Sequence, residues 1–291
     1  MNFCLKRQNM KPKDKIIQGD ALEVLKKIDD NFVDLGITSP PYNKGEKNKG
    51  WLVRNVKYNV ANDNLAEEIY QKQQIQVLNE IFRVTKPGGS FFYNHKTRWT
   101  QGKMLHPIEW LEKTNWTVRQ EIIWDRMIAA NISGWRFWQI DERIYWLYKP
   151  IDGNKIGKEL KSKHALLTSI WRFPPERKNG HPAPFPLLLP TRIIYSILDD
   201  EKGIVLDPYV GSGTTCLAAK LLGLNYIGID ISKEYVKDAE KRLKNYLNCK
   251  KIVDEEISKH FVEKTFADRK NNNGNTGKYR NGITSPQAKL L

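Results

Sequence analysis

The sequence has no long apolar run and few cysteines. No stretch of its 291 residues approaches the roughly 18 apolar residues that cross a bilayer, and Met1–Lys15 is basic and polar, without an apolar run of signal-peptide length. The three cysteines, Cys4, Cys216 and Cys249, lie far apart and never in a Cys-x-x-Cys spacing. We therefore expect a cytoplasmic protein, not inserted in a membrane, with neither a disulfide framework nor a cysteine-bound zinc ion.

Several catalytic signatures are also missing. The sequence has no His-Glu-x-x-His pattern and no His-x-Glu combined with Cys-x-x-Cys, so metalloproteases and zinc deaminases are disfavoured because their metal ligands are lacking. It has no Gly-x-x-x-x-Gly-Lys-Ser/Thr loop, which argues against ATP hydrolysis within this chain. We therefore expect no metal ion in the functional site of this chain.

The chain is strongly basic. It contains 48 Lys and Arg residues against 33 Asp and Glu residues, a formal net charge of +15. Such a surplus attracts polyanions, and nine tryptophans supply flat rings on which bases can stack. Nucleic acid is the favoured partner. A generally basic protein whose tryptophans fill its core would have the same composition, so the motifs have to distinguish the two interpretations.

Strand-like and helix-like segments alternate along the chain. The apolar periodicity predicts strands at 15–18, 32–38, 90–93, 117–124, 142–148, 203–206 and 225–229, and helices at 21–28, 65–85, 104–113, 187–198, 213–222 and 233–246. This alternation predicts an α/β fold with a mostly parallel sheet. The segment 43–64 is rich in Asn, Lys and Gly, which is typical of a functional or disordered loop.

Composition divides the chain into four parts. Residues 15–148 form a first α/β half, 149–181 a basic and turn-rich insertion, 182–250 a second α/β half, and 251–291 a polar tail. The tail is too polar to bury, so we expect much of 265–291 to be disordered.

The first candidate site is a glycine-rich loop between a strand and a helix. Residues 207–215 read Asp-Pro-Tyr-Val-Gly-Ser-Gly-Thr-Thr, where the glycines let a ligand approach the backbone and the helix start favours a carboxylate or phosphate. Asp230 ends the next strand and suits two ribose hydroxyls. Position 216 is Cys rather than the third glycine of the dinucleotide pattern. Together these features predict a nucleoside site, with which NAD is still compatible.

The second candidate site is Thr38-Ser39-Pro40-Pro41-Tyr42, at the end of another strand. Two prolines fix φ and remove two backbone donors, so the carbonyl before the second proline is free to point into a cleft. Ser39 Oγ and the Pro40 carbonyl can hold both N–H bonds of an exocyclic base amine, with Tyr42 stacked on the ring. In isolation the motif would read as an ordinary strand-ending turn. His95, after the strand at 90–93, we expect to be structural rather than catalytic.

The two motifs together closely resemble those of the DNA amino-methyltransferases, which use S-adenosylmethionine to methylate cytosine N4 or adenine N6. Residues 39–42 match that family's catalytic motif and 207–215 its cofactor loop, with Tyr209 where Phe is commoner. The resemblance covers roughly residues 15–247 and includes Gly19-Asp20-Ala21-Leu22, Lys86-Pro87-Gly88-Gly89 and His181-Pro182-Ala183-Pro184-Phe185-Pro186. It implies a Rossmann-like methyltransferase fold, with a twisted, mostly parallel, seven-stranded sheet and helices on both faces.

The order of the motifs resembles the circularly permuted order of the beta class, because the catalytic motif comes first and the cofactor loop last. Glutamine methyltransferases that act on release factors carry a related motif after the cofactor loop, so they are disfavoured. In the beta class the segment between the motifs recognises the target, which assigns DNA binding to about 150–180. Within this segment we select three basic residues as DNA-binding, Arg172, Arg177 and Lys178. A solvated basic loop is the alternative.

The resemblance also implies roles for the site residues. The catalytic set is Ser39, Pro40, Pro41 and Tyr42, which would hold a base flipped out of the duplex. The cofactor-binding set is Asp20, Ala21, Phe185, Asp207, Pro208, Gly211, Ser212, Gly213, Thr214, Asp230 and Ile231. Within it, the amides of 211–213 would face the methionine carboxylate, Asp230 would take the ribose hydroxyls, and Asp20 the adenine amine.

The target base and the partners are further expectations from the resemblance. Serine at the first motif position resembles the cytosine-N4 enzymes, whereas Asp and often Asn accompany adenine-N6 methylation, so we expect N4-methylcytosine with adenine N6 as the alternative. No cysteine follows a proline, so the covalent cytosine-C5 route is not expected. A DNA-binding paralogue without turnover is the alternative outside the enzymes. The expected partners are double-stranded DNA, a cognate restriction endonuclease and a second copy of the chain.

Overall fold

The computed structural model describes residues 10–43, 64–129, 134–152, 167–176, 185–198 and 202–261. The strands are β1 (Lys15–Gln18), β2 (Val33–Thr38), β3 (Thr85–His95), β4 (Arg98–Thr100), β5 (Lys103–Leu105), β6 (Thr117–Asp125), β7 (Asp141–Tyr148), β8 (Ile170–Arg172), β9 (Ile204–Asp207) and β10 (Asn225–Asp230). The helices are α1 (Ala21–Leu25), α2 (Glu67–Val84), α3 (Ile108–Leu111), α4 (Leu188–Ile197), α5 (Thr214–Leu221), α6 (Lys233–Lys244) and α7 (Lys250–His260), with a short 3-10 helix η1 (Tyr246–Cys249) before α7.

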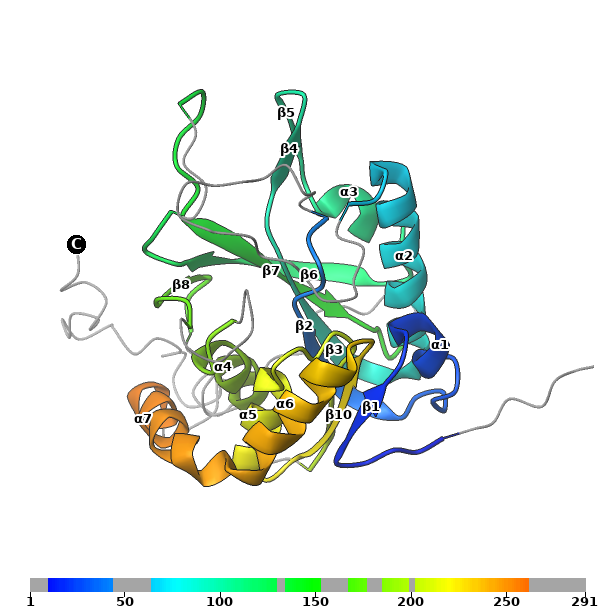
Figure 1. Ribbon diagram of the computed structural model, residues 1–291, viewed down its shortest axis with the longest axis vertical. Coiled ribbons are helices and arrows are strands. Elements are labelled where there is room, and N and C mark those ends of the chain that lie inside the picture. Colours follow the sequence, from blue (N-terminus) through cyan, green and yellow to red (C-terminus); the bar gives the residue numbers. More distant parts are fainter. Residues whose placement is uncertain are drawn as a thin grey trace, which may run out of the picture.

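The main sheet runs in the order β1-β10-β9-β2-β3-β7-β6-β8 (Figure 1). Neighbouring strands are parallel except at β3–β7 and β7–β6, so β7 alone runs against the others. The expected mostly parallel α/β sheet is confirmed. Within the described residues it has eight strands rather than seven, because Ile170–Arg172 of the expected insertion pairs with the free backbone groups at the edge of β6.

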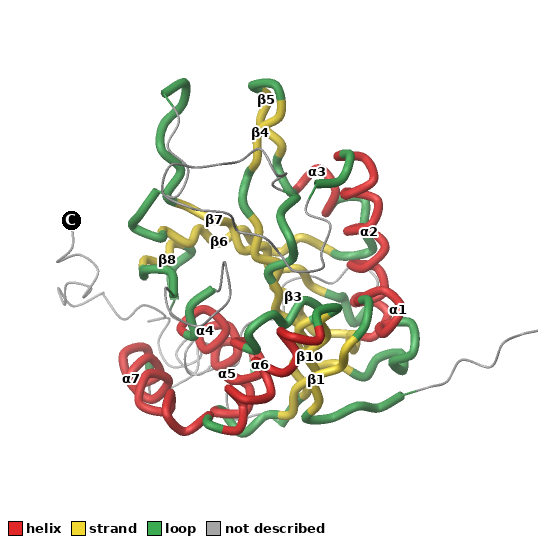
Figure 2. Tube along the Cα trace, in the orientation of Figure 1, coloured by secondary structure: helices red, strands yellow, loops and turns green. Residues whose placement is uncertain are grey.

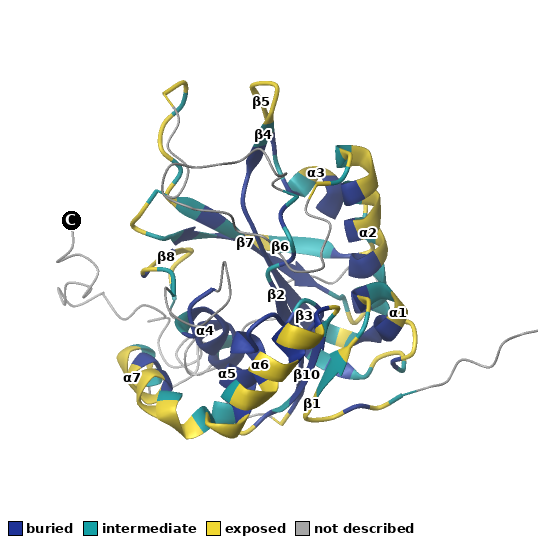
Figure 3. Ribbon diagram, viewed as in Figure 1, coloured by how far each residue is buried: buried dark blue, intermediate teal, exposed yellow. Residues whose placement is uncertain are grey.

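Helices cover both faces of the sheet (Figure 2), and a separate apolar core of buried side chains lies under each helix layer. Helices α1, α2 and α3 pack over the first core on one face, and α4 and α5 over the second core on the other, with α7 against α4. Successive side chains of a strand point to opposite faces, so Phe91 belongs to one core and Phe92 to the other. In Figure 3 the strands at the centre are buried and the outer helix surfaces are exposed.

A β-hairpin replaces part of a helix that we expected at 104–113. Strands β4 and β5 pair across the two residues Gln101 and Gly102, whose φ angles are 48° and 79°. Two positive φ values in a two-residue loop match the twist of a hairpin. The helix is therefore limited to Ile108–Leu111. Residues 86–89, which we expected to separate the helix at 65–85 from the strand at 90–93, instead form the irregular start of β3, where Gly88 has a φ of 82° and the register with β2 shifts.

The first part of the expected polar tail is helical. Helix α7 spans Lys250–His260, and Val253 and Glu256 are buried against the rest of the molecule. Glu256 forms a buried ion pair with Arg192 of α4, which joins α7 to the second core. The expectations for 265–291, for most of the loop 43–64 and for most of the insertion lie outside the described residues. Within the described ranges, no helix combines the length and apolar character needed to cross a bilayer.

Candidate active site

Both motifs lie at one edge of the sheet, at the carboxyl ends of β2 and β9. These strands are neighbours in the middle of the sheet. The chain leaves them in opposite directions, since β2 leads through α2 to β3 and β9 leads through α5 to β10. Such a switch point is where open α/β sheets bind ligands. The topology therefore brings the motifs together, although 169 positions separate Thr38 from its hydrogen-bond partner Asp207.

Ser39 and Tyr42 belong to a buried hydrogen-bond network. Ser39 Oγ lies 2.7 Å from Tyr42 Oη, and Tyr42 Oη donates to Glu142 Oε2 at 2.8 Å. Asn94 Nδ2 lies 2.7 Å from Tyr42 Oη and 2.8 Å from Glu142 Oε2. Arg126 forms an ion pair with Glu142 Oε1 at 3.2 Å. The network thus connects the catalytic motif to the end of β3 and the start of β7.

The donors in this network determine what the Ser39 hydroxyl can do. Glu142, as the carboxylate of an ion pair, only accepts hydrogen bonds. Tyr42 has one hydroxyl proton and donates it to Glu142, so the Ser39 hydroxyl is the donor in its contact with Tyr42. Asn94 approaches Ser39 Oγ at the longer distance of 3.3 Å. Ser39 Oγ therefore retains a lone pair with which it can accept an N–H bond.

The ring of Tyr42 is more enclosed than we expected. It is only 5% exposed, and its centroid lies 4.5 Å from that of His95. Its hydroxyl is engaged with Ser39 and Glu142. The structure therefore adds a role for the hydroxyl, and stacking of a base on this ring stays a prediction.

His95 packs beneath the Ser-Pro-Pro-Tyr motif, against the ring of Tyr42. It is fully buried, with Nδ1 2.8 Å from Lys96 O and Nε2 2.8 Å from Tyr70 Oη. Tyr70 Oη also donates to Pro41 O at 2.8 Å. Both ring nitrogens have partners, so His95 is a structural residue, and the carbonyl of Pro41 is held by Tyr70.

The glycine-rich loop is closed by its own hydrogen bonds. Gly211 and Gly213 have φ angles of 47° and 81°, in the left-handed region that favours glycine. Gly211 N donates to Asp230 Oδ2 at 2.9 Å, and Gly213 N donates to Val210 O at 2.8 Å. We expected these amides to face a ligand carboxylate, and in the structure they are used within the site. The amides in the first turn of α5, which helical geometry leaves without a partner inside the helix, are the donors suited to that task.

Asp230 and Asp20 follow neighbouring strands. Asp230 accepts one backbone amide on each oxygen, from Gly211 and from Ser232 at 2.8 Å, and each oxygen retains a further lone pair. Burial raises the pKa of Asp230 above its ordinary value. Asp20 is exposed and caps α1, and Gly19 N donates to Asp230 O at 2.9 Å. The two carboxylates thus lie at adjacent strand ends, as a nucleoside with ribose hydroxyls and a ring amine requires.

Asp207 connects the two motifs through buried hydrogen bonds. Its Oδ1 accepts the hydroxyl of Thr38 at 2.6 Å and the amide of Tyr209 at 3.1 Å, and its Oδ2 accepts the hydroxyl of Thr215 at 2.6 Å. Asp207 is 1% exposed, and this burial raises its pKa to about 6 although the hydroxyl donors oppose the rise. In this structure Asp207 is a positioning residue, and a direct contact with a cofactor stays a prediction.

The other expected cofactor residues divide by exposure. Those that are buried are Ala21, Phe185, Pro208, Ser212 and Thr214. Ile231 is 43% exposed and directly follows Asp230, so it offers an apolar surface beside the carboxylate. The structure brings this set together around the ends of β1, β9 and β10, apart from Phe185, which precedes α4 and packs in the second core.

Arg242 on α6 is a residue that the sequence did not single out. It donates to Thr214 Oγ1 at 2.8 Å and to Ser212 Oγ at 3.3 Å, and to Glu176 Oε1 at 3.1 Å. Glu176 lies in the described part of the expected DNA-recognition segment. Arg242 therefore connects the glycine-rich loop to that segment.

The expected DNA-binding residues are only partly described. Arg172 is exposed, but it forms an ion pair with Asp125 at 2.8 Å. This partner reduces the charge that Arg172 can offer to a phosphate. Arg177 and Lys178 lie outside the described residues.

Asn94, Glu142 and Arg126 were also missed. Asn94 had a usable signal, because a polar residue at the end of a buried strand lies at the ligand-binding edge. Arg126 had the same signal, because it follows the carboxyl end of β6, which runs in the direction of β2 and β3. Glu142 had none, because it reaches this edge only through the reversed direction of β7.

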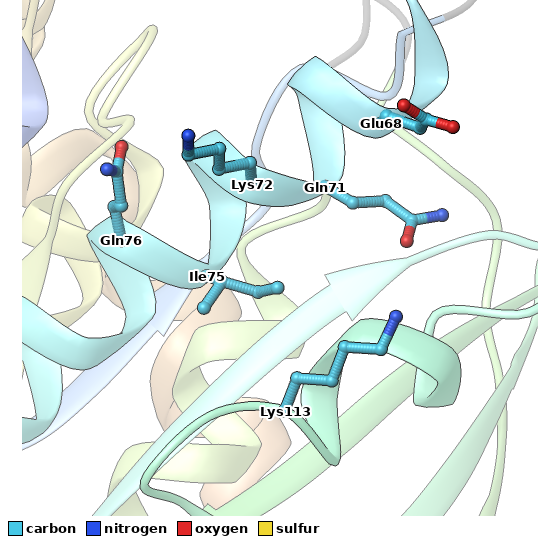
Figure 4. A pocket seen from close by; sticks show the side chains of 6 residues that line it. All are labelled: Glu68, Gln71, Lys72, Ile75, Gln76 and Lys113. Atoms are coloured by element: carbon cyan, nitrogen blue, oxygen red, sulfur yellow. The ribbon is translucent and has the colours of Figure 1, made fainter.

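A shallow hollow of about 300 Å³ lies elsewhere, on the outer side of α2 and beyond α3. Figure 4 shows its lining side chains, which are Glu68, Gln71, Lys72, Ile75, Gln76 and Lys113. The set includes no residue of either motif, so this hollow is separate from the candidate active site.

The fold and the paired motifs agree with comparison to known families. A family model described as DNA methylase, N6_N4_Mtase, matches residues 33–241, which include both motifs. The chain belongs to this DNA methylase family.

Individual relatives and structures agree with this membership. The chain is 28% identical over 261 residues to Type II methyltransferase M.ScaI of Streptomyces caespitosus, covering 78% of this chain and 80% of that protein. It is 28% identical over 256 residues to DNA adenine methyltransferase YhdJ of Escherichia coli, covering 78% and 82%. Among solved structures, TTHA0409 of Thermus thermophilus complexed with S-adenosyl-L-methionine has a TM-score of 0.57 at 25% identity, covering 80% and 95%. PvuII DNA methyltransferase (cytosine-N4-specific) shares the fold, with a TM-score of 0.60 at 20% identity, covering 87% and 97%.

Proposed function

We propose that this chain transfers a methyl group from S-adenosylmethionine to the exocyclic amine of a base flipped out of duplex DNA, and that the base is cytosine, methylated at N4. Membership of the DNA methylase family supports the reaction class. The single observation that carries the proposal is the Ser39 hydroxyl, which donates to Tyr42 and so presents a lone pair at the switch point between the two motifs.

The cofactor assignment is supported by the chemistry of the residues present. Carboxylates at adjacent strand ends, Asp20 and Asp230, suit the adenine amine and ribose hydroxyls, and the first turn of α5 suits the methionine carboxylate. The related structure of TTHA0409 holds the same cofactor. When bound, S-adenosylmethionine supplies a methyl group on a positively charged sulfur, which is an electrophile.

The protein's own residues then position the amine. Ser39 Oγ accepts one N–H bond and the Pro40 carbonyl the other, which holds the nitrogen lone pair toward the cofactor side of the site. Tyr42, Asn94 and Glu142 fix the direction of the Ser39 hydroxyl. The neutral serine stabilises positive charge on nitrogen less than a carboxylate would, so geometry makes the larger contribution.

The choice of cytosine rests on serine at the first position of the motif, and PvuII methyltransferase, whose fold this chain shares, is cytosine-N4-specific. Adenine N6 is the second candidate, because YhdJ is a DNA adenine methyltransferase and is 28% identical to this chain. We also propose a cytoplasmic enzyme that acts as a homodimer beside a cognate restriction endonuclease, in line with relatives that are type II methyltransferases.

The first prediction tests this function. Purified protein incubated with labelled cofactor and mixed-sequence DNA is expected to label the DNA, and digestion to nucleosides followed by mass spectrometry is expected to identify N4-methylcytosine. Replacing Ser39 by Ala is expected to remove most turnover and to leave cofactor affinity unchanged, because in this proposal Ser39 binds the target amine and not the cofactor. Ser258→Ala, an exposed serine on α7, serves as the matched control.

The outcomes separate the candidates. N6-methyladenine alone would refute the choice of base and leave the reaction class standing. DNA binding with no label under any tested salt concentration would identify a paralogue without turnover.

A further inference from the structure

An exposed aromatic segment precedes β7. Residues 135–138, which we call the aromatic loop, read Trp-Arg-Phe-Trp. Trp135 is 60% exposed, Phe137 99% and Trp138 61%, so three large rings face solvent within four residues. Soluble proteins rarely leave so much contiguous apolar surface uncovered, and such patches mark interaction sites.

The β4–β5 hairpin stands beside the aromatic loop and braces it. Arg136 lies 4.0 Å from the ring centroid of Trp99, and the rings of Trp99 and Trp135 meet edge to face at 6.3 Å. At the base, Gln139 Nε2 donates to Thr97 Oγ1 at 2.8 Å. Figure 3 shows the hairpin and the segment before β7 as two exposed projections from the same side of the molecule. The backbone of the aromatic loop is therefore anchored by contacts of Trp135 and Arg136 on one side of Phe137 and of Gln139 on the other.

The base of the aromatic loop is built into the catalytic network. Arg126 N donates to Ile140 O at 2.8 Å, and Arg126 also pairs with Glu142 at 3.2 Å. Glu142 in turn accepts the hydroxyl of Tyr42 at 2.8 Å. Only five positions separate Phe137 from Glu142, about 17 Å of fully extended chain, so the exposed rings lie within reach of the catalytic motif.

The charge around the rings selects the kind of partner. Residues 126–140 and 96–108 contain no Asp or Glu. Among their cations, Arg126 and Arg98 are paired with acids elsewhere in the fold, and Lys96 is buried. The cations at this surface are therefore Lys103, which is exposed, and Arg136, which lies over the ring of Trp99. A polyanion is complementary to this surface. A twofold contact with a second copy would place the same cations opposite one another, which is unfavourable.

We propose that the aromatic loop contacts duplex DNA beside the target base, and that Phe137 inserts into the base stack at the place the flipped base leaves. This inference rests on the proposed function and deepens it. Opening a base pair costs stacking energy, and an inserted apolar side chain restores part of that energy. Trp135 and Trp138 supply rings on which exposed bases can stack, while Arg136 is held against Trp99.

The test compares two duplexes that carry the methylated site mapped with the wild-type enzyme. In one the target base is paired, and in the other it faces an abasic position, so that it is already unpaired. Phe137→Ala is expected to lower kcat/KM on the paired duplex by about tenfold or more, the effect of losing one stacked ring, and by much less on the unpaired duplex. Phe261→Ala, a half-exposed phenylalanine after α7, is the matched control and is expected to leave both rates unchanged.

Each other outcome overturns the proposal. Equal losses on both duplexes would show that Phe137 does not act by replacing the flipped base, and unchanged rates would remove the aromatic loop from the DNA interface. A change in sedimentation of Phe137→Ala without a change in duplex discrimination would assign the surface to self-association. Failure of the proposed function is distinguishable, because then the wild type methylates neither duplex.

Discussion

At the scale of single residues, Asp207 shows how one buried carboxylate aligns two motifs. It accepts hydrogen bonds from the hydroxyls of Thr38, which precedes Ser39, and of Thr215, in the first turn of α5. Both bonds are 2.6 Å long. A shift of the glycine-rich loop would therefore move Thr38 and with it Ser39, so that Asp207 couples the proposed cofactor side of the site to the proposed target side.

The second prediction concerns the protonation of Asp207. Its pKa is raised to about 6 in the folded protein, from an ordinary value of 3.8, so folding favours the protonated form. As pH rises from 4 to 7 the unfolded state ionises first, and the wild type loses stability relative to Asp207→Asn. The difference between the two pKa values corresponds to roughly 3 kcal/mol. Unfolding free energies of both proteins at several pH values measure it, and a constant difference across this range would contradict it.

The third prediction concerns the hydroxyl of Tyr42. If Tyr42 acted by stacking alone, Tyr42→Phe would keep full activity. We expect kcat to fall by about tenfold or more, because the Ser39 hydroxyl loses its acceptor and Glu142 and Asn94 lose a buried partner, at a cost of about 1–3 kcal/mol.

Calorimetry on the same variant is expected to show unchanged cofactor affinity. Tyr145→Phe is the matched control, because the Tyr145 hydroxyl is buried and has no hydrogen-bond partner among the described residues. Full activity of Tyr42→Phe would remove the network from the mechanism.

At the scale of elements, α6 connects two parts of the molecule for which we predict different ligands. Arg242 reaches from α6 to Thr214 at the start of α5 and to Glu176 in the 167–176 segment. The 167–176 segment also adds β8 to the sheet beside β6. The expected cofactor loop and the expected DNA-recognition segment thus share one guanidinium group, which bonds both at once.

The fourth prediction follows from this link. Arg242→Ala is expected to weaken cofactor binding by about tenfold, the scale of a lost charge-assisted hydrogen bond. Glu176→Gln keeps the contact to the loop and is expected to change cofactor binding less, while reducing the gain in DNA affinity that the cofactor gives. Titrations with and without the demethylated cofactor measure both effects, and Lys241→Ala on the same helix is the control. Equal behaviour of all three variants would show that Arg242 is not a link.

At the scale of the whole molecule, only part of the positive charge is available to bind DNA phosphates. Several cations are already paired within the fold, such as Arg192 with Glu256 and Arg172 with Asp125. Paired cations contribute less to phosphate binding than free ones, so the count of 48 Lys and Arg residues overstates the number of available contacts. Salt dependence of DNA binding is the measurement that counts those contacts.

The fifth prediction uses that measurement on the expected recognition segment. Replacing Arg172, Arg177 and Lys178 by Ala together is expected to weaken DNA binding and to flatten the slope of log K against log salt, by up to about 0.9 for each phosphate that the variant no longer neutralises. Arg172→Ala alone is expected to change the slope less, because Asp125 already pairs with it. The matched control removes Lys250, Lys251 and Lys259 of α7, with the same change in net charge. Identical slopes for the two triple variants would leave this segment a solvated basic loop.

Much of the molecule was determined by local sequence. Apolar periodicity predicted nearly all of the sheet strands and α2, α4, α5 and α6, but not α7, and the turn chemistry of the Ser-Pro-Pro-Tyr motif and the glycine-rich loop marked both halves of the site. Such features depend on neighbours a few positions apart, so they can be read without a fold. The hairpin at Gln101 and Gly102 was not predicted. Both turn residues have positive φ angles, which are typical of glycine-containing pairs, and the residues on either side show little apolar alternation.

What the tertiary structure decided is which groups are left to react. The reversed direction of β7 brings Glu142 to Tyr42, which donates its proton to Glu142. The Ser39 hydroxyl therefore donates to Tyr42, and Ser39 Oγ keeps a lone pair that can accept an N–H bond. The closure of the glycine-rich loop on Asp230 withdraws an amide that its sequence presents as a ligand donor. The partners of these groups come from segments far apart in the chain, and sheet order and register set them. Each N–H or O–H proton is shared with few acceptors, so its availability is known only when every neighbour is placed.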